Sequence, residues 1–204
     1  MNEHTSIPNH HADYPGFSGL SGLVAALSMV TGRTGDAQLA MRLSTVGAGD
    51  SVVDVGCGPG VAARYAARRG ATVTGVDPAP IMLRVARLLT GPSGNVRYVK
   101  GAAETLPLPD NSASAVWAIA TVHHWPDLDA GLREVNRVLA SGSRLVAMER
   151  RTQPDAHGLG SHGWTDAQAD AFAELCREHG LLDVHVERNA IGHRSTVSVT
   201  GTAP

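Results

Sequence analysis

The 204-residue sequence predicts an α/β fold in which a mostly parallel sheet ends in an antiparallel hairpin. From residue 51 onward, short runs of β-branched residues alternate with Ala-, Leu- and Arg-rich segments of helical period, which is typical of βαβ units. The last two strand-like runs, 182–188 and 194–200, have no helix between them and predict a hairpin at the sheet edge. A content of 43% hydrophobic residues in a chain of this length favours one domain with one buried core.

The expected elements follow from the apolar pattern along the chain. Strands are expected at residues 51–55, 71–76, 95–100, 113–120 and 144–149, and helices at 61–69, 79–89, 128–139 and 165–179. Ahead of the first strand, helical spacing predicts a helix near 18–30, and Gly35 with Asp36 starts a second helix that ends before Gly47. Residues 1–18 lack any apolar period and are interpreted as an arm. The chain is thus divided into an N-terminal arm and helical segment, 1–45, and a main α/β part, 46–204.

Composition narrows the classes of partner and the compartment. Seventeen Lys and Arg residues against nineteen Asp and Glu residues give a net charge of −2 without a basic block, so no nucleic-acid partner is expected. No apolar run approaches the roughly 20 residues that cross a bilayer, and the N-terminus lacks a signal-peptide pattern, so a cytoplasmic protein without a membrane partner is expected. Cys57 and Cys176 are too few for a disulfide framework.

A glycine-rich turn, VGCGPG, follows the first predicted strand. Gly56, Gly58 and Gly60 stand at every second position, at the edge where α/β sheets bind ligands. Glycine permits positive φ and lacks the Cβ that would keep a ligand from the backbone. Dinucleotide sites have the spacing G-x-G-x-x-G, but Val61 occupies the place of the third glycine, so a dinucleotide is disfavoured. The alternative is an ordinary tight turn.

The second predicted strand ends at Asp77, adjacent to the glycine turn in a parallel sheet. An acid at that strand tip typically accepts hydrogen bonds from ribose hydroxyls. The same side chain can cap the following helix ahead of Pro78, and the two roles are compatible. Because the acid and the glycine turn agree, they favour a ligand that contains a nucleoside.

Four successive stretches resemble the motifs of class I S-adenosylmethionine-dependent methyltransferases. They read VVDVGCGPG, GVDPAP, GAAETLPLPDNSASAVWAIATVHHWPD and LREVNRVLASGSRLVAMER, and the resemblance covers about residues 45–150. Within this group the chain is most similar to small-molecule methyltransferases of the ubiquinone/menaquinone-biosynthesis type (methyltransferase type 11). The resemblance implies a Rossmann-like fold with seven strands in the order 3-2-1-4-5-7-6. It also implies S-adenosyl-L-methionine as cofactor and S-adenosyl-L-homocysteine as product.

The resemblance further implies which residues face the cofactor. Asp54 and the glycine turn would face the methionine half, Asp77 the ribose, and Ala120 the methionyl moiety. After the third strand the family commonly reads Gly-Asp-Ala-Glu, with the acid on the adenine amino group, whereas this chain reads GAAE, so backbone groups or the glutamate would read the adenine. The expected cofactor contacts are Asp54, Gly56, Cys57, Gly58, Gly60, Asp77, Pro78, Met82, Ala102, Ala103, Glu104 and Ala120.

Methyl transfer from a sulfonium is an in-line displacement, for which the enzyme mainly supplies alignment and a dry pocket. A base is needed only where the acceptor nucleophile carries a proton at neutral pH. His123 and His124 follow the fourth predicted strand, where the transferable methyl should lie, and are the candidates for acid/base catalysis. The alternative is that one of them binds a loop backbone while the other packs beside Trp125.

The acceptor is expected to be a small molecule with an oxygen, nitrogen or carbon nucleophile. In the resembling family, segments ahead of the first strand fold over the cofactor as a lid, so the arm with His10, His11, Tyr14 and Phe17 is expected to meet the acceptor. Glu149 and Arg150 could equally form a solvated ion pair, and the stretch around His162 a helix-capping loop with Thr165 or Ser161 as cap. The expected acceptor contacts are His11, Tyr14, Trp125, Glu149, Arg150, His162 and Trp164.

Ten histidines do not by themselves predict a metal site. Adjacent histidines on one extended segment point apart, and neither an H-x-x-x-H pair nor a cysteine cluster completes a tetrahedral ligand set. The arm would have to fold back to bring ligands together. No metal is therefore expected.

Two other functions stay open on the sequence alone. A nicotinamide-dependent oxidoreductase would be indicated by a glycine at position 61 and a Tyr-x-x-x-Lys motif, neither of which is present. A non-catalytic cofactor-binding regulator or accessory protein is favoured if Ala102, in place of the acid, reflects lost activity. A monomer or homodimer is expected, because the apolar face of residues 20–30 could cover the core or a second copy.

Overall fold

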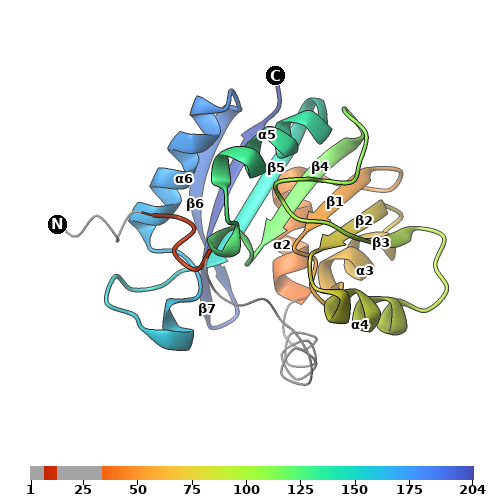
Figure 1. Ribbon diagram of the computed structural model, residues 1–204, viewed down its shortest axis with the longest axis horizontal. Helices are drawn as coiled ribbons and strands as arrows, with labels where there is room; N and C mark the ends of the chain where they lie inside the picture. The colour runs from red at the N-terminus through yellow and green to blue at the C-terminus, as the bar shows by residue number, and fades with distance from the viewer. Residues whose placement is uncertain (1–6, 13–33) are drawn as a thin grey trace.

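Figure 1 shows the computed structural model, which describes residues 7–12 and 34–204. Seven strands form one sheet in the order β3-β2-β1-β4-β5-β7-β6. They are β1 (Ser51–Val55), β2 (Thr72–Asp77), β3 (Val96–Lys100), β4 (Ala113–Ile119), β5 (Leu139–Arg150), β6 (Leu182–Ile191) and β7 (Arg194–Thr202). Strands β1 to β5 are parallel, whereas β7 runs antiparallel to both β5 and β6. The predicted strand order and C-terminal hairpin are confirmed.

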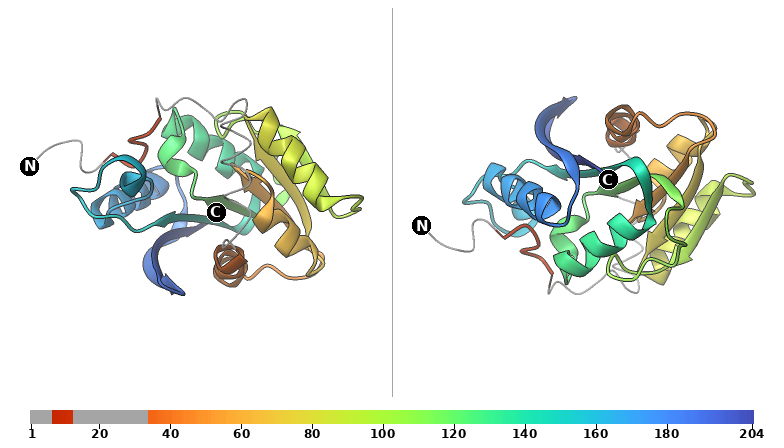
Figure 2. Two further views of the ribbon diagram at one scale, coloured as in Figure 1. Left: turned by 90° about the horizontal axis from the view of Figure 1, so that it is seen from below. Right: turned by 90° about the horizontal axis from the view of Figure 1, so that it is seen from above.

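Helices cover both faces of this sheet (Figure 2). They are α2 (Thr34–Ser44), α3 (Val61–Ala67), α4 (Pro80–Thr90), α5 (Leu128–Val138) and α6 (Asp166–Glu178), with short 3-10 turns η2 (Val122–His124) and η3 (Gly158–Ser161). Apolar side chains of α2, α3 and α4 pack with one face of the strands, and those of α5 and α6 pack with the other. The central strands β1, β2 and β4 are buried on both sides, which is why their sequences read as nearly continuous apolar runs rather than alternating ones.

The described residues differ from the sequence prediction at element boundaries. Strand β5 begins at Leu139, five residues before the expected start, because the chain passes from α5 directly into the sheet and Leu139 pairs with Ala113 ahead of a bulge. The hairpin turn is two residues, Gly192 and His193, rather than the expected five, since Gly192 adopts φ +58° and permits a tight turn. Helix α2 begins at Thr34, two residues early.

Local capping and core packing fix the helices around the sheet. Thr165 and Gln168 form a reciprocal capping box at the start of α6, so Thr165 is the predicted cap. Trp117 of β4 is fully buried, and its indole Nε1 donates to the Ser44 Oγ at 3.0 Å, which ties α2 to the sheet. Among the described residues, no helix is both long and apolar enough to cross a membrane.

The parallel strands all end at the same edge of the sheet. The chain leaves β1 at the glycine turn, β2 at Asp77, and β4 at Ala120, which leads into η2. Strand β5 brings Glu149 to this edge, because its neighbour Met148 pairs with Ile119 at the end of β4. The topology therefore gathers the sequence-predicted site residues of four strands in one region.

Candidate functional site

The glycine turn between β1 and α3 is a backbone cradle. Gly56, Gly58 and Gly60 adopt φ of +67°, +51° and +77°, values that glycine tolerates far better than other residues. A Cβ on Gly56 would clash with the side chain of Thr121, and one on Gly60 with the hydroxyl of Tyr98. A Cβ on Gly58 would meet no atom of the described residues within 4 Å. The turn is thus closed by protein on two sides and open at Gly58, as a ligand that contacts the backbone requires.

Asp77 holds this turn in place. One carboxylate oxygen accepts a hydrogen bond from the Gly58 amide at 2.9 Å, and the other accepts from the Ala79 amide at 2.8 Å. Burial raises the pKa of Asp77, while the two amide hydrogen bonds act in the opposite direction. Each carboxylate oxygen can accept a second hydrogen bond, so anchoring the turn leaves acceptor capacity for a ligand hydroxyl.

Asp54 and Cys57 lie deeper than the turn itself. Asp54 is buried in β1, with 2% of its surface exposed. Burial, and then the negative charges of Asp54 and Asp77, raise the pKa of the Cys57 thiol well above its usual value. Cys57 is therefore a neutral side chain of small volume, as its position in the turn predicts.

The segment after β3 is arranged differently from an acid-bearing adenine loop. Ala102 pairs with Thr105 in an isolated bridge, Ala103 is buried in the core, and Glu104 is half-buried. The Glu104 carboxylate accepts from the Asp127 amide at 3.4 Å, at the start of α5. The glutamate is therefore engaged with a neighbouring loop.

Three further expected cofactor contacts fall in different environments. Pro78 is exposed, whereas Met82 is buried and packs with Val85 of the same helix. Ala120 adopts φ +55°, which is uncommon for a residue with a Cβ, and its amide donates to the Met148 carbonyl at 2.7 Å. Backbone strain of this kind occurs at functional sites. Ala120 connects the end of β4 to Thr121, whose side chain borders the glycine turn.

A buried histidine–glutamate pair lies beside the cradle. His123 Nδ1 is 2.9 Å from Glu149 Oε2, and the two side chains are 3% and 0% exposed. The contact is at ion-pair distance but is not aligned as a hydrogen bond, whereas Glu149 Oε1 accepts from the His123 backbone amide at 3.4 Å. The second ring nitrogen, Nε2, is buried and has no hydrogen-bond partner among the described residues. His123 thus has a buried ring nitrogen to which no described residue forms a hydrogen bond.

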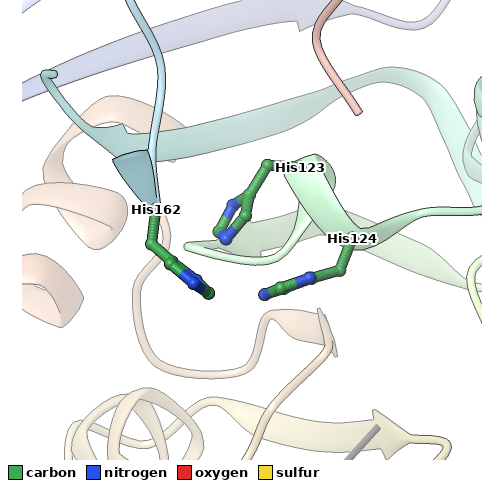
Figure 3. Close-up of side chains that lie close together, drawn as sticks. All are labelled: His123, His124 and His162. Atoms are coloured by element: carbon green, nitrogen blue, oxygen red, sulfur yellow. The ribbon is translucent and has the colours of Figure 1, made fainter. Parts of the chain in front are cut away.

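Three imidazoles converge at this point. His123 and His124 come from η2 and His162 from the loop after η3, and Figure 3 shows the rings pointing toward one another. The ring centroids of His123 and His124 are 4.0 Å apart. The expectation that the adjacent pair points apart is wrong, because the chain forms a 3-10 turn there rather than an extended segment. One ring nitrogen from each of the three lies within 4.8 Å of those of the others.

The described part of the arm, residues 7–12, folds against this cluster. The His11 amide donates to the His123 carbonyl at 2.9 Å, and the Asn9 side chain donates to the Trp125 carbonyl at 2.9 Å. The His11 ring stacks on His162 with centroids 4.4 Å apart and planes at 18°. His10 instead uses both nitrogens on protein, the Ser161 carbonyl and the Gln168 amide. The arm therefore forms one wall of the cluster.

Most rings of this cluster are neutral at neutral pH. Burial, and then the neighbouring histidines, lower the pKa of His11 to about 4. Burial, followed by the charge of His123, lowers the pKa of His124 to about 4, and the same causes lower the pKa of His162. Packing several imidazoles together thus favours the neutral form of these rings.

The remaining expected acceptor contacts are distributed between core and surface. Trp125 and Trp164 are buried in the core, and the Trp164 Nε1 donates to the Pro8 carbonyl at 2.8 Å. Arg150 is exposed and donates to the carbonyls of His162 and Gly160, so it braces the loop that carries His162. Tyr14, Phe17 and the expected helix near 18–30 lie outside the described residues.

Sequence reasoning missed the residues that connect these parts. Thr121 fills the space beside Gly56 and joins the cradle to η2, and Tyr98 fills the space beside Gly60. Gln168 donates to the Ile7 carbonyl at 3.0 Å, and the Ser161 hydroxyl lies 3.2 Å from His11 Nε2. No local motif marks these contacts, because their partners are far away along the chain.

Known proteins resemble this chain in sequence and in fold. A family profile described as "Methyltransferase domain" matches residues 53–147. Methyltransferase GfsG of Streptomyces halstedii is 39% identical over 141 residues, which cover 67% of this chain and 49% of the relative. Demethylmenaquinone methyltransferase of Tropheryma whipplei (strain Twist) is 38% identical over 112 residues, covering 54% and 46%.

The fold has the same kind of match among solved structures. A SAM-dependent methyltransferase from Aquifex aeolicus superposes with a TM-score of 0.72 at 18% identity, over 89% of this chain and 98% of that one. At this identity the likeness establishes the fold alone. The chain spans about half the length of the two curated relatives it matches.

Proposed function

We propose, on the premise of the methyltransferase-domain match over residues 53–147, that the chain is a methyltransferase that transfers a methyl group from S-adenosyl-L-methionine to a small-molecule acceptor. The observation that carries the proposal is the position of Gly58, where a Cβ would meet no described residue within 4 Å although Cβ atoms on the flanking glycines would meet Thr121 and Tyr98. A ligand that needs close backbone approach fits there. The amide of Gly58 is already oriented by the Asp77 carboxylate.

The residues of the cradle suit a nucleoside joined to an amino acid. Asp77 would hold the ribose hydroxyls, with its second acceptor positions, and Asp54 with the glycine turn would face the methionine half. The turn lacks the third glycine of a pyrophosphate site, which supports a ligand without phosphates. When bound, the cofactor supplies the methyl group and a sulfonium leaving group, and the chain's own residues supply orientation.

The acceptor would approach from the histidine side. Thr121 touches the cradle at Gly56 and is two residues from His123, so the histidines lie beside the methionine half of the cradle. Residues 7–12 and the loop with His162 wall this side, and exclusion of water favours transfer to the acceptor rather than side reactions. Acid/base catalysis by His123 or His124 stays a prediction, and the same geometry has a second use that is argued below.

The finer assignments belong to the proposal as well. We place the activity in the cytoplasm, with no nucleic acid or membrane as partner, because a net charge of −2 without a basic block offers no electrostatic footprint for either. We propose a monomer or homodimer. We also propose that residues 1–45 act as an arm and lid on the domain of residues 46–204, which the packing of residues 7–12 on His123 and Trp164 supports.

Two measurements test the proposed function. Calorimetric titration with S-adenosyl-L-homocysteine, and separately with NAD, asks which ligand the cradle takes. Release of labelled methyl from S-adenosyl-L-methionine onto small molecules of a cell extract then asks whether transfer occurs. We expect binding of S-adenosyl-L-homocysteine and not of NAD, together with a labelled small-molecule product.

The other outcomes point to the alternatives. Binding of NAD alone would overturn the proposal in favour of an oxidoreductase. Tight binding of S-adenosyl-L-homocysteine without transfer to any fraction would identify a non-catalytic regulator or accessory protein.

A further inference from the structure

We propose that His123, His124 and His162 form a binding site for one divalent transition-metal ion, with zinc as the best match, at the carboxyl edge of β4 and β5. The inference stands on the side-chain geometry of the three histidines and does not require methyl transfer. It departs from the expectation, drawn from the sequence, that the chain has no metal site.

The first argument is convergence. The three rings come from two separate segments, η2 and the loop after η3, and point toward one another (Figure 3). Their candidate ligand nitrogens lie within 4.8 Å of one another. Zinc with Zn–N bonds of 2.0–2.1 Å holds tetrahedral nitrogens about 3.3 Å apart, so the rings need to close by roughly 1.5 Å. The half-buried loop that carries His162 is the part that can make this adjustment.

The second argument is the arrangement around the two histidines of η2. His124 Nδ1 lies 3.3 Å from the His11 carbonyl, and since a carbonyl only accepts, this nitrogen carries the proton and Nε2 keeps its lone pair. His123 Nδ1 faces the Glu149 carboxylate at 2.9 Å, and a proton on Nδ1, directed at that carboxylate, would leave the lone pair of this ring on Nε2. Metal-binding histidines almost always direct their other nitrogen to a carboxylate or a backbone carbonyl. Both partners are present here before any ion is bound.

The third argument is that the interior holds a carboxylate and a ring nitrogen that a cation would stabilise. Glu149 is 1% exposed, and its carboxylate lies 2.9 Å from His123 Nδ1 and 3.4 Å from the backbone amide of His123. A buried carboxylate is costly unless a positive charge compensates it. His123 Nε2 is buried without a hydrogen-bond partner among the residues that the structure describes. A cation bound to Nε2 would satisfy that atom and compensate Glu149 through the imidazole.

The ligand set indicates the class of metal and the kind of site. Imidazole nitrogens suit zinc, copper, iron and nickel, whereas calcium and magnesium require oxygen ligands. Three protein ligands with a fourth position left to solvent or substrate are typical of catalytic rather than structural zinc. Since His10 has both nitrogens engaged with Ser161 and Gln168, it is not the fourth ligand.

A role for the ion in catalysis rests on the proposed function. A hydroxyl acceptor bound at the fourth coordination position of the ion would lose its proton to solvent more easily, because coordination lowers the pKa of the hydroxyl. An oxygen lone pair would then form the bond to the methyl carbon, while the electrons of the breaking S–C bond return to sulfur and leave S-adenosyl-L-homocysteine. In this arrangement the ion activates the acceptor and no free histidine base is needed.

The experiment is metal binding by the full chain without cofactor. The protein is treated with chelator, dialysed, and titrated with Co²⁺, whose absorption spectrum reports tetrahedral nitrogen coordination, and with Zn²⁺ in competition with a fluorescent chelator. We expect one ion per chain. His162→Ala should weaken zinc binding by at least about 100-fold, and Glu149→Gln, which leaves the first ligands intact, by about 10–100-fold.

His157→Ala is the matched control, because His157 is an exposed histidine on the other side of η3, between β5 and α6. Circular dichroism and thermal unfolding of each metal-free variant verify that it folds. Unchanged zinc affinity in His162→Ala would overturn the site, as would the absence of any Co²⁺ spectrum from the wild-type chain. A loss in His157→Ala equal to that in His162→Ala would also overturn it. Binding of S-adenosyl-L-homocysteine is measured separately, so the metal site and the proposed function can fail independently.

Discussion

The glycine turn and the histidine cluster lie side by side at one sheet edge, but one is formed by backbone atoms and the other by side chains. The turn uses backbone, with three positive φ angles and one buried carboxylate that holds the Gly58 amide. The cluster uses the side chains of His123, His124 and His162, and His10 and His11 pack against it from a distant part of the chain. Thr121 is the contact between the two regions, since it fills the space beside Gly56.

The two kinds of construction suit two different tasks. One is to bind a cofactor of fixed structure, and the other is to act on an acceptor whose structure can vary. A backbone cradle depends on φ angles and the absence of Cβ atoms, so it tolerates few substitutions and suits a cofactor of fixed shape. A side-chain cluster can be altered residue by residue without refolding the sheet that positions it. We therefore expect changes in the turn to affect cofactor binding, and changes in the cluster to affect metal binding and the acceptor.

Gly58→Ala should produce the largest effect and tests whether the open space in the turn is a ligand site. The substitution introduces a methyl group where a Cβ meets no atom of the described part of the chain, so we expect affinity for S-adenosyl-L-homocysteine to fall by at least about 100-fold in calorimetry. The free energy of unfolding should decrease by only about 1–2 kcal/mol, the cost of an alanine at positive φ.

Gly192→Ala is the control for backbone strain. Gly192 has φ +58°, close to the +51° of Gly58, and a Cβ there also meets nothing within 4 Å, but it lies in the hairpin turn between β6 and β7. It should lose similar stability and keep full affinity. Equal affinities for the two variants would break the comparison, because the turn would then not be the cofactor cradle.

Asp77→Asn should have the next largest effect. An amide oxygen can accept from only one of the two backbone amides at 2.9 and 2.8 Å, and its NH₂ group then faces the other donor. We expect about a 10–100-fold loss of affinity for S-adenosyl-L-homocysteine together with a loss of about 1–3 kcal/mol in stability. Asp50→Asn is the matched control, because the Asp50 carboxylate accepts from the Gly47 amide at the opposite end of β1. It should retain cofactor affinity.

The contrast between the regions also explains what the sequence could predict. The turn is local, so glycine spacing, Asp77 and the βαβ rhythm identified it, and strand order followed from the family resemblance. The strand expected at 144–149 is present, but its start at Leu139 was missed because tertiary pairing with Ala113 extends β5 into a stretch that reads as the end of a helix. Element boundaries depend on such partners rather than on the local pattern.

The histidine cluster could not be predicted in the same way. His123 and His124 were identified as candidates from their place after β4, but their mutual orientation depends on a 3-10 turn that no residue of TVHHW marks. Convergence with His162 depends on a loop braced by Arg150, and the wall formed by His11 depends on hydrogen bonds to residues more than 100 positions away. Three-dimensional proximity of this kind leaves no periodic signal.

Trp164→Phe should have a moderate effect confined to the histidine side. Phenylalanine can keep the packing against Phe172 but cannot donate to the Pro8 carbonyl, which the indole Nε1 does at 2.8 Å. Losing about 1 kcal/mol there should speed hydrogen exchange of the His11 amide about fivefold, measured by mass spectrometry of the N-terminal peptide. Trp117→Phe removes a comparable buried hydrogen bond on the other face of the sheet and should leave that peptide unchanged. Equal acceleration in both variants would mean that residues 7–12 respond to global rather than local stability.

Asp166→Asn should have the smallest effect and tests how firmly the loop with His162 is closed. Asp166 at the start of α6 accepts from Arg151 at 2.8 and 2.6 Å and from Arg188 at 3.2 Å, which joins the two ends of that loop. These arginines hold the pKa of Asp166 well below its usual range. The folded state therefore binds fewer protons here than the unfolded state, so the stabilisation is present above the ordinary Asp pKa of about 3.9 and is lost as the pH falls below it.

We expect the variant to be less stable than the wild type by about 1 kcal/mol at pH 7, and the difference to shrink toward pH 3 in urea unfolding. Asp170→Asn, an exposed carboxylate on the same helix, should show a smaller difference at pH 7. Affinity for S-adenosyl-L-homocysteine should stay unchanged in both variants, because the cradle is built from separate backbone. A difference that stays constant with pH would show that the arginine pairing does not close the loop, and the histidine side would then be held by residues 7–12 and Arg150 alone.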